Sequence, residues 1–88
     1  MTAEVSAAAP VTVTVRAFAA AAESLGSEQF GVEASTVASL REALSGYSGT
    51  APEVISRCSM LRDGDRLDDA VSLSAGDVVD VLPPFAGG

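Results

Sequence analysis

The sequence predicts an α+β domain in which one main helix covers one face of a mixed four- to five-stranded sheet. Residues 11–18 alternate apolar and polar side chains, as a half-buried strand does. Residues 37–48 repeat apolar side chains at helical spacing. Residues 78–82 alternate again and end at two consecutive prolines, which cannot continue a sheet.

The first predicted strand, residues 11–18, turns its valines toward the core and places Arg16 and Phe18 on the opposite side. Phe18 is there either a contact at the edge of the domain or part of a binding surface. Residues 19–25 are rich in alanine and predict a helical turn. Residues 28–34 predict a second strand, antiparallel to the first.

The main helix is predicted over residues 37–48. Ser35 and Thr36 are both good N-caps, and Gly46 and Gly49 are expected to end the helix. The apolar residues form one stripe on the helix: Val37, Leu40, Ala43, Leu44 and Tyr47. This stripe is expected to cover the sheet.

The second half of the chain supplies the remaining strands. Residues 52–57 predict a short turn or helix that Pro52 opens, and residues 58–62 predict a third strand. Asp63-Gly64 predicts a tight hairpin turn, followed by a short return strand. The last strand, residues 78–82, is expected to pair with the first strand and so to place it centrally in the sheet.

The net charge of the chain limits the classes of partner that it can bind. A net charge of −7 arises from twelve acidic residues and five arginines, with no lysine. No basic patch is available to neutralise phosphates, so nucleic acid is not an expected partner. The acidic surface serves either solubility or a basic protein partner.

The residues that most enzymes use for catalysis are scarce. The absence of histidine excludes Ser-His and Cys-His pairs and histidine-containing metal sites, and no metal site is expected. The lone Cys58 is expected to be a small buried residue. A single cysteine, short apolar runs and an N-terminus without basic residues predict a cytoplasmic protein that does not enter the membrane.

The last residues are expected to lie outside the core. We therefore predict a flexible leader over residues 1–10, a domain over 11–82 and an extended tail over 83–88. Gly87 and Gly88 lack Cβ atoms, so their backbone can enter a narrow channel. Once activated, for example by adenylation with ATP, the terminal carboxylate can be attacked by a sulfur or amine nucleophile. The alternative is that these residues are a flexible C-terminus without a function.

The order of elements and the tail resemble the ubiquitin-like β-grasp sulfur carriers of the MoaD/ThiS type, and most of all the small subunit of molybdopterin synthase. The resemblance covers nearly everything after residue 10. It is carried by these stretches: Phe18-Ala19 with Glu23, Leu25 and Gly26; Thr36-Val37 with Leu40-Arg41; Asp63-Gly64, Leu73 and Gly76-Asp77; and Pro83-Pro84-Phe85-Ala86-Gly87-Gly88. The last of these is the most specific.

The resemblance implies a sulfur carrier for molybdopterin synthesis. An adenylating enzyme would use ATP to activate Gly88, and a sulfur donor protein would convert it to a thiocarboxylate. The sulfur would then pass to a cyclic pyranopterin precursor on the large synthase subunit. No permanently bound cofactor is implied, and the catalytic side chains belong to partners, so whether the chain counts as an enzyme stays open.

The resemblance also implies roles for the residues of the tail. Gly88 reacts, Gly87 gives access and Phe85 anchors, while the two prolines limit the entropy lost on binding. The residues expected to bind partners are Phe18, Leu82, Pro83, Pro84, Phe85, Ala86 and Gly87. Three alternatives stay open: a sulfur carrier for thiamin thiazole, cysteine or tRNA thiolation; a protein modifier joined by isopeptide bonds; and an interaction domain without catalytic chemistry.

Overall fold

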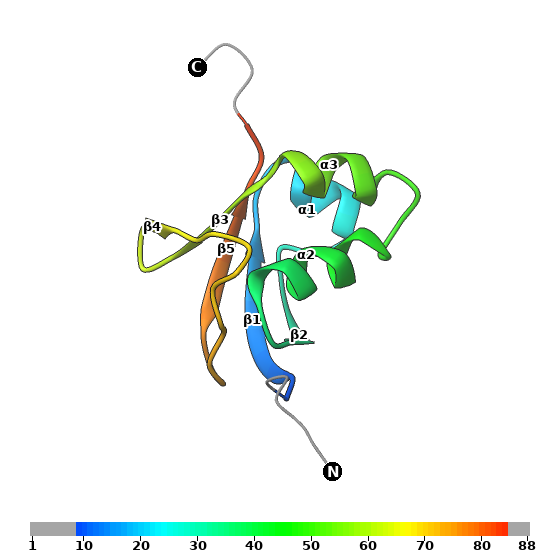
Figure 1. Cartoon of the computed structure of the whole chain (residues 1–88). Coiled ribbons are helices and arrows are strands. Elements are labelled where there is room, and N and C mark those ends of the chain that lie inside the picture. Colours follow the sequence, from blue (N-terminus) through cyan, green and yellow to red (C-terminus); the bar gives the residue numbers. More distant parts are fainter. Residues whose placement is uncertain (1–8, 85–88) are drawn as a thin grey trace.

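The computed structural model describes residues 9–84, which form a five-stranded mixed sheet with helices on one of its faces (Figure 1). The strands are β1 (Val11–Ala17), β2 (Gln29–Ala34), β3 (Ser59–Arg62), β4 (Asp65–Arg66) and β5 (Val78–Leu82). The helices are α1 (Ala20–Leu25), α2 (Val37–Ser45) and α3 (Ala51–Arg57). The predicted α+β class and mixed sheet are confirmed, and α1 and α3 are short helices where the sequence predicted a helical turn over 19–25 and a short turn or helix over 52–57.

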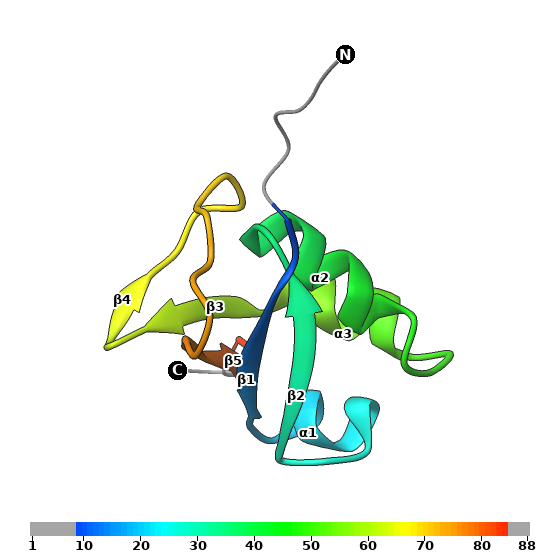
Figure 2. The ribbon, with the colours of Figure 1, turned by 90° about the horizontal axis from the view of Figure 1, so that it is seen from below.

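The strand order is β2-β1-β5-β3-β4. β1 runs antiparallel to β2 and parallel to β5, and β5 runs antiparallel to β3. The first and last strands of the chain therefore lie side by side near the centre, as predicted. Figure 2 shows the helices on one side of this sheet. Because β1 and β5 are parallel, the start of β1 and the end of β5 lie at opposite ends of the sheet.

The core lies between the helices and the sheet. Its fully buried side chains come from both layers: Val13 and Val15 of β1, Val79 and Val81 of β5, Met60 of β3, Val37, Leu40 and Leu44 of α2, and Ile55 of α3. The alternation of β1 and β5 is thus confirmed. Val11 is only half-buried, because it lies at the end of β1, and it packs at the edge of the core.

The start of α2 confirms the predicted N-cap. The Thr36 side chain accepts a hydrogen bond from the Ser39 amide at 3.1 Å, and the Ser39 hydroxyl accepts one from the Thr36 amide at 2.9 Å. This reciprocal arrangement is a capping box in which serine takes the place usually held by glutamate or glutamine. It pairs amides that the helix itself leaves without acceptors.

The end of α2 differs from the prediction. Gly46 is its C-cap, as predicted, but the helix stops at Ser45, short of the predicted end at residue 48. Tyr47 lies beyond the helix and is exposed, and Ala43 is exposed within it, so including these two residues in the buried stripe was wrong. The Tyr47 ring instead packs on Phe30 of β2, with ring centroids 5.3 Å apart. Glycine favoured an earlier stop than the apolar pattern indicated.

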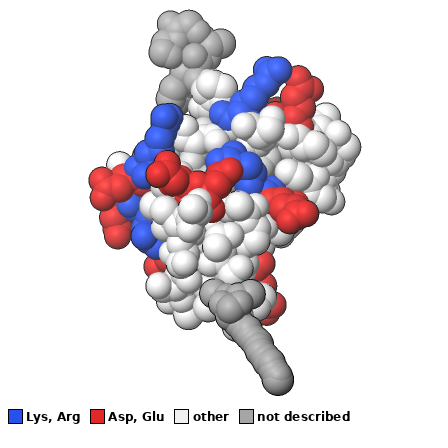
Figure 3. Space-filling model, viewed as in Figure 1, with Lys and Arg blue, Asp and Glu red and all other residues white. Residues whose placement is uncertain are grey.

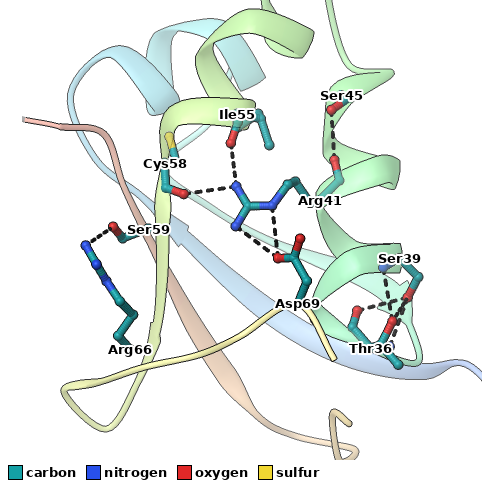
Figure 4. A network of polar contacts seen from close by, with 9 residues as sticks. All are labelled: Thr36, Ser39, Arg41, Ser45, Ile55, Cys58, Ser59, Arg66 and Asp69. Atoms are coloured by element: carbon teal, nitrogen blue, oxygen red, sulfur yellow. Dashed lines mark hydrogen bonds and ion pairs between the residues drawn. The ribbon is translucent and has the colours of Figure 1, made fainter. Parts of the chain in front are cut away.

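Arg41 joins parts of the fold that are distant in sequence (Figure 4). Its Nη1 donates to the carbonyl oxygens of Ile55 at 2.7 Å and Cys58 at 2.9 Å. Its Nε and Nη2 both reach Asp69 Oδ1 at 3.3 Å. The last carbonyls of a helix lack the amide donors of a following turn, and Arg41 supplies a further donor to them at the end of α3. We call this arrangement the Arg41 clamp.

Cys58 is buried, as predicted, but it ends α3 rather than starting the third strand. Its thiol donates to the Val54 carbonyl oxygen at 3.2 Å. Burial raises the pKa of the thiol, and the nearby Arg41 charge offsets part of that rise. A buried, protonated thiol is a poor nucleophile. Cys58 is thus a packing residue.

The predicted hairpin turn is confirmed between β3 and β4. Asp63 and Gly64 have φ angles of 54° and 83°, the left-handed pair that a two-residue hairpin needs. The predicted short return strand is β4, which covers Asp65–Arg66. A pairing of Arg62 Nη1 with Asp77 Oδ2 at 2.8 Å holds the turn end of this hairpin against the turn before β5.

Candidate functional site

The chain leaves the sheet at the end of β5. The strand stops at Leu82, as predicted, and Pro83 is half-buried while Pro84 is exposed. We call Pro83 and Pro84 the tail stem. Phe85, Ala86, Gly87 and Gly88 lie outside the described residues, so their roles stay predictions.

Two predicted partner-binding residues lie together at this point. The Phe18 amide donates to the Val81 carbonyl oxygen at 3.3 Å, and Ala17 pairs with Val81 in the sheet register. This register places Phe18 beside Leu82. The Phe18 side chain is 41% exposed, whereas Leu82 is half-buried. The structure therefore brings an exposed aromatic ring next to the root of the tail.

The sheet face opposite the helices continues this surface. Arg16 on β1 forms a two-pronged pair with Asp80 on β5, at 2.7 Å and 3.2 Å. Val78 of β5 is exposed, and Leu61 of β3 is half-buried beside Asp80. The face thus alternates apolar side chains with one neutralised pair of charges. Such a surface suits a protein partner better than a small ligand.

A strained turn positions Phe18. The Ala21 amide donates to the Phe18 carbonyl oxygen at 3.0 Å, and Ala19 between them has φ 52° and ψ −126°. This conformation is the first central position of a type II′ turn, where glycine is usual. Ala19 and Phe18 line a surface hollow of about 430 Å³ at the end of β1. No signal in the sequence predicted this turn.

Ala19→Gly is therefore expected to stabilise the domain. Relief of the strain should raise the free energy of unfolding by about 1 kcal/mol, after the greater chain entropy of glycine is subtracted. Ala20→Gly is the matched control, since it begins α1 and should lower the free energy of unfolding by about 0.5–1 kcal/mol. Urea unfolding of both variants measures the difference. A loss of stability in Ala19→Gly as large as in the control would contradict the strain.

Two further hollows flank the tail stem. One, of about 200 Å³, lies on the helical side and is lined by Ala20, Glu53, Val54 and Arg57 together with both prolines. The other, of about 320 Å³, lies on the strand side and is lined by Leu61 and Arg66 together with both prolines. Sequence reasoning missed these neighbours of the tail because they come from α1, α3, β3 and β4, which only folding brings together.

The described residues hold little chemistry of their own. Within residues 9–84, no group of histidine, cysteine, aspartate and glutamate side chains could hold a metal ion. In the same part of the chain, no helix combines the length and the apolar character that a bilayer span needs. The described residues instead present the tail stem and a contact surface, which suit contact with a partner protein.

The comparisons with known proteins agree with this reading. Small archaeal modifier protein 1 of Haloferax volcanii is 27% identical, with a TM-score of 0.72, and the match covers 88% of this chain and 99% of that one. A chain from the complex of subunits 1 and 2 of molybdopterin-converting factor of Helicobacter pylori is 29% identical, with a TM-score of 0.66, and the match covers 89% and 100%. No curated protein is significantly similar in sequence.

More distant structures show the fold alone. Small archaeal modifier protein 1 of Methanosarcina acetivorans has a TM-score of 0.78 at 18% identity, covering 92% of this chain and 100% of that one. A ubiquitin from Caldiarchaeum subterraneum has a TM-score of 0.60 at 14% identity, covering 90% and 99%. The sheet order and the main helix are thus those of a ubiquitin-like β-grasp. The ThiS family profile matches residues 15–88, and the chain belongs to the ThiS family of ubiquitin-like carriers and modifiers.

Proposed function

We propose that this chain is a sulfur carrier whose Gly88 carboxylate is activated by a partner and converted to a thiocarboxylate. The sulfur is then donated to a cyclic pyranopterin precursor in molybdopterin synthesis. The observation that carries the proposal is the family match, which runs through the tail to Gly88. The geometry of the described residues supports it, because the chain leaves the sheet beside an exposed aromatic surface.

The chemistry needs two steps before sulfur is delivered. A carboxylate oxygen of Gly88 attacks the α-phosphorus of ATP, the bond to the β-phosphate breaks, and pyrophosphate leaves. Hydrosulfide, supplied by a sulfur donor protein, then attacks the acyl carbon and expels AMP. ATP is bound and used by the adenylating partner, so the carrier itself needs no resident cofactor. The proposal places the carrier in the cytoplasm, where ATP is available.

The proposed partners use the surface around the tail stem. Phe18 and Leu82 form the apolar contact beside the tail, and the Arg16–Asp80 pair lies on the same face. Similarity to a chain from a complex of two molybdopterin-converting factor subunits favours a large synthase subunit as one partner. An adenylating enzyme is the other, because a carboxylate does not react until it is activated.

The intact mass of the protein tests the proposal. The chain is incubated with ATP, an adenylating enzyme and a sulfur donor. The expected result is a mass gain equal to the difference between sulfur and oxygen, located at Gly88 by fragmentation. No gain with an enzyme that activates its own known carrier would contradict the proposal. Product formed with the large synthase subunit and the pyranopterin precursor would distinguish molybdopterin synthesis from thiamin, cysteine or tRNA thiolation.

Protein modification is the second candidate. It is favoured by the similarity to small archaeal modifier protein 1, which covers nearly all of that chain. The activated Gly88 would then acylate an amine of a target protein and form an isopeptide bond. This chain has no lysine, so it cannot form lysine-linked chains of itself. Conjugates of higher mass that carry a Gly-Gly remnant on target lysines would support this function.

Phe85→Ala is expected to weaken docking on the large synthase subunit. An apolar anchor in a partner pocket contributes about 1–3 kcal/mol, so the dissociation constant should rise roughly 10- to 100-fold. Isothermal titration calorimetry measures the dissociation constant. Phe30→Ala is a useful control, because Phe30 packs on Tyr47 and not at the tail stem. Equal affinities for the wild-type chain and Phe85→Ala would remove the anchoring role.

A further inference from the structure

Two arginines bracket the tail stem, although the chain carries a net charge of −7. Arg57 ends α3 and lines the hollow on the helical side of Pro83 and Pro84. Arg66 lies in β4 and lines the hollow on the strand side of the same prolines. Each hollow beside the stem therefore has a guanidinium group in its wall.

A third hollow connects the two arginines. It has a volume of about 330 Å³ and is lined by Arg57, Arg66 and Arg41, together with Ser59 and Leu67, and its lining includes no carboxylate side chain. Figure 3 shows basic side chains on this face over α3 and β4, with acidic side chains between them. Arg41 is held in the clamp, whereas Arg57 and Arg66 are exposed. The hollow between Arg57 and Arg66 therefore has only basic charges in its wall, whereas Glu53 lies beside Arg57 in the hollow on the helical side.

Both exposed guanidinium groups have capacity for a ligand. Arg66 donates to the Ser59 hydroxyl at 2.7 Å and makes no ion pair with any residue between 9 and 84. Arg57 pairs with Glu53 at 3.0 Å, one helical turn away, and these side chains are 66% and 74% exposed. Exposed pairs of this kind contribute only about 0.3–0.5 kcal/mol, so a better-placed carboxylate can displace Glu53.

We propose that Arg57 and Arg66 bind carboxylate side chains at the rim of the channel through which an adenylating enzyme receives the tail. This inference rests on the proposed function. A guanidinium group pairs with a carboxylate through two parallel hydrogen bonds, which gives direction as well as attraction. Two such contacts on opposite sides of the stem fix how the carrier is rotated about its tail.

The reach of the tail identifies the ligand as protein. The six residues from Pro83 to Gly88 span about 20 Å when fully extended. A tail drawn out to Gly88 in a channel places the stem far from the ATP that Gly88 attacks, so the phosphates of ATP are not within reach of Arg57 or Arg66. We choose the adenylating enzyme as the partner because a sulfur carrier and a protein modifier both require activation of the Gly88 carboxylate.

The test is ATP–pyrophosphate exchange with the adenylating enzyme of the same organism, measured over a range of carrier concentrations. The double variant Arg57→Gln/Arg66→Gln is expected to raise the KM for the carrier about tenfold and to leave kcat unchanged, because rim charges govern association and not chemistry. Arg62→Gln is the control for loss of an arginine charge. It pairs with Asp77 and lines none of the three hollows.

A raised KM could also result from partial unfolding of the variant. A variant that is expected to lower the KM excludes this explanation. Glu53→Gln frees Arg57 and removes a negative charge beside the stem, so the KM should fall about twofold. The KM of the wild-type chain should also rise with salt more steeply than that of the double variant. Thermal unfolding confirms that each variant is folded at the assay temperature.

The outcomes separate the inference from the proposed function. If the wild-type chain is active and the double variant has the same KM as Arg62→Gln, the inference is overturned and the proposed function stands. If the wild-type chain supports no exchange, the proposed function fails and the inference fails with it. A raised KM for the double variant together with a lowered KM for Glu53→Gln establishes the inference.

Discussion

Removal of Gly87 and Gly88 is expected to abolish thiocarboxylate formation and to leave the midpoint of thermal unfolding unchanged. In the proposed function the reacting carboxylate belongs to Gly88, and a tail that is two residues shorter cannot bring its carboxylate to the same ATP. Neither glycine has a side chain to bury, and Val81 is the last buried core residue among residues 9–84. Activity should therefore fall below detection, by at least about 1,000-fold, or roughly 4 kcal/mol.

The control is a deletion of equal length at the other end, removing Thr2 and Ala3. These residues lie outside the family match, which begins at residue 15. Intact mass after incubation with ATP, adenylating enzyme and sulfur donor compares the two deletions with the wild-type chain. Full thiocarboxylate formation without Gly87 and Gly88 would remove the carrier function, and a lowered unfolding midpoint would show that the tail packs on the domain.

Arg41→Ala is expected to lower the free energy of unfolding by about 2–4 kcal/mol. The substitution removes the donor to the Ile55 and Cys58 carbonyl oxygens and the ion pair with Asp69. The Arg41 side chain is only 22% exposed, so water replaces it incompletely. This loss is a large fraction of the whole free energy of unfolding of a domain of this size. Urea unfolding, followed by circular dichroism, measures it.

Two further variants separate the parts of the Arg41 clamp. Arg57→Ala removes an exposed arginine whose only ion pair among residues 9–84 lies on the same helix, and should cost less than about 0.5 kcal/mol. Asp69→Asn keeps the carbonyl contacts of Arg41 and should cost about 1 kcal/mol or less. An Arg41→Ala loss no larger than that of Arg57→Ala would show that the carbonyl contacts contribute nothing measurable.

The departures from prediction have local physical reasons. The apolar stripe of the main helix extended to Tyr47, but Gly46 ended the helix first, and the ring found a partner on β2 instead. Cys58 was expected in a strand because it alternates with Met60, yet its amide still bonds to the Ile55 carbonyl of α3 at 3.1 Å. In both cases the side-chain pattern predicted most of the element correctly. The error lay at one end of the element, because backbone hydrogen bonds determine the residue at which a helix or strand begins or ends.

Much about this protein was determined by the sequence alone. Alternation over residues 11–18 and 78–82, the helical stripe through Leu40 and Leu44, and the Asp63-Gly64 turn are local patterns, and each was confirmed. The ending in Pro-Pro and Gly-Gly indicated the family, to which the profile match now assigns the chain. Local patterns predict local structure because they depend on backbone geometry and side-chain spacing, which do not change with distant contacts.

Only the tertiary structure decided what surrounds the tail stem. Arg57 and Arg66 are nine positions apart in the sequence and lie in different elements, and both are far along the chain from Phe18. The parallel pairing of β1 with β5 brings Phe18 to Leu82, and α3 and β4 bring Arg57 and Arg66 to Pro83 and Pro84. The residues next to the tail stem are determined by the strand order and by the packing of the helices on the sheet. Both depend on the burial of one shared core, and neither leaves a periodic pattern in the sequence.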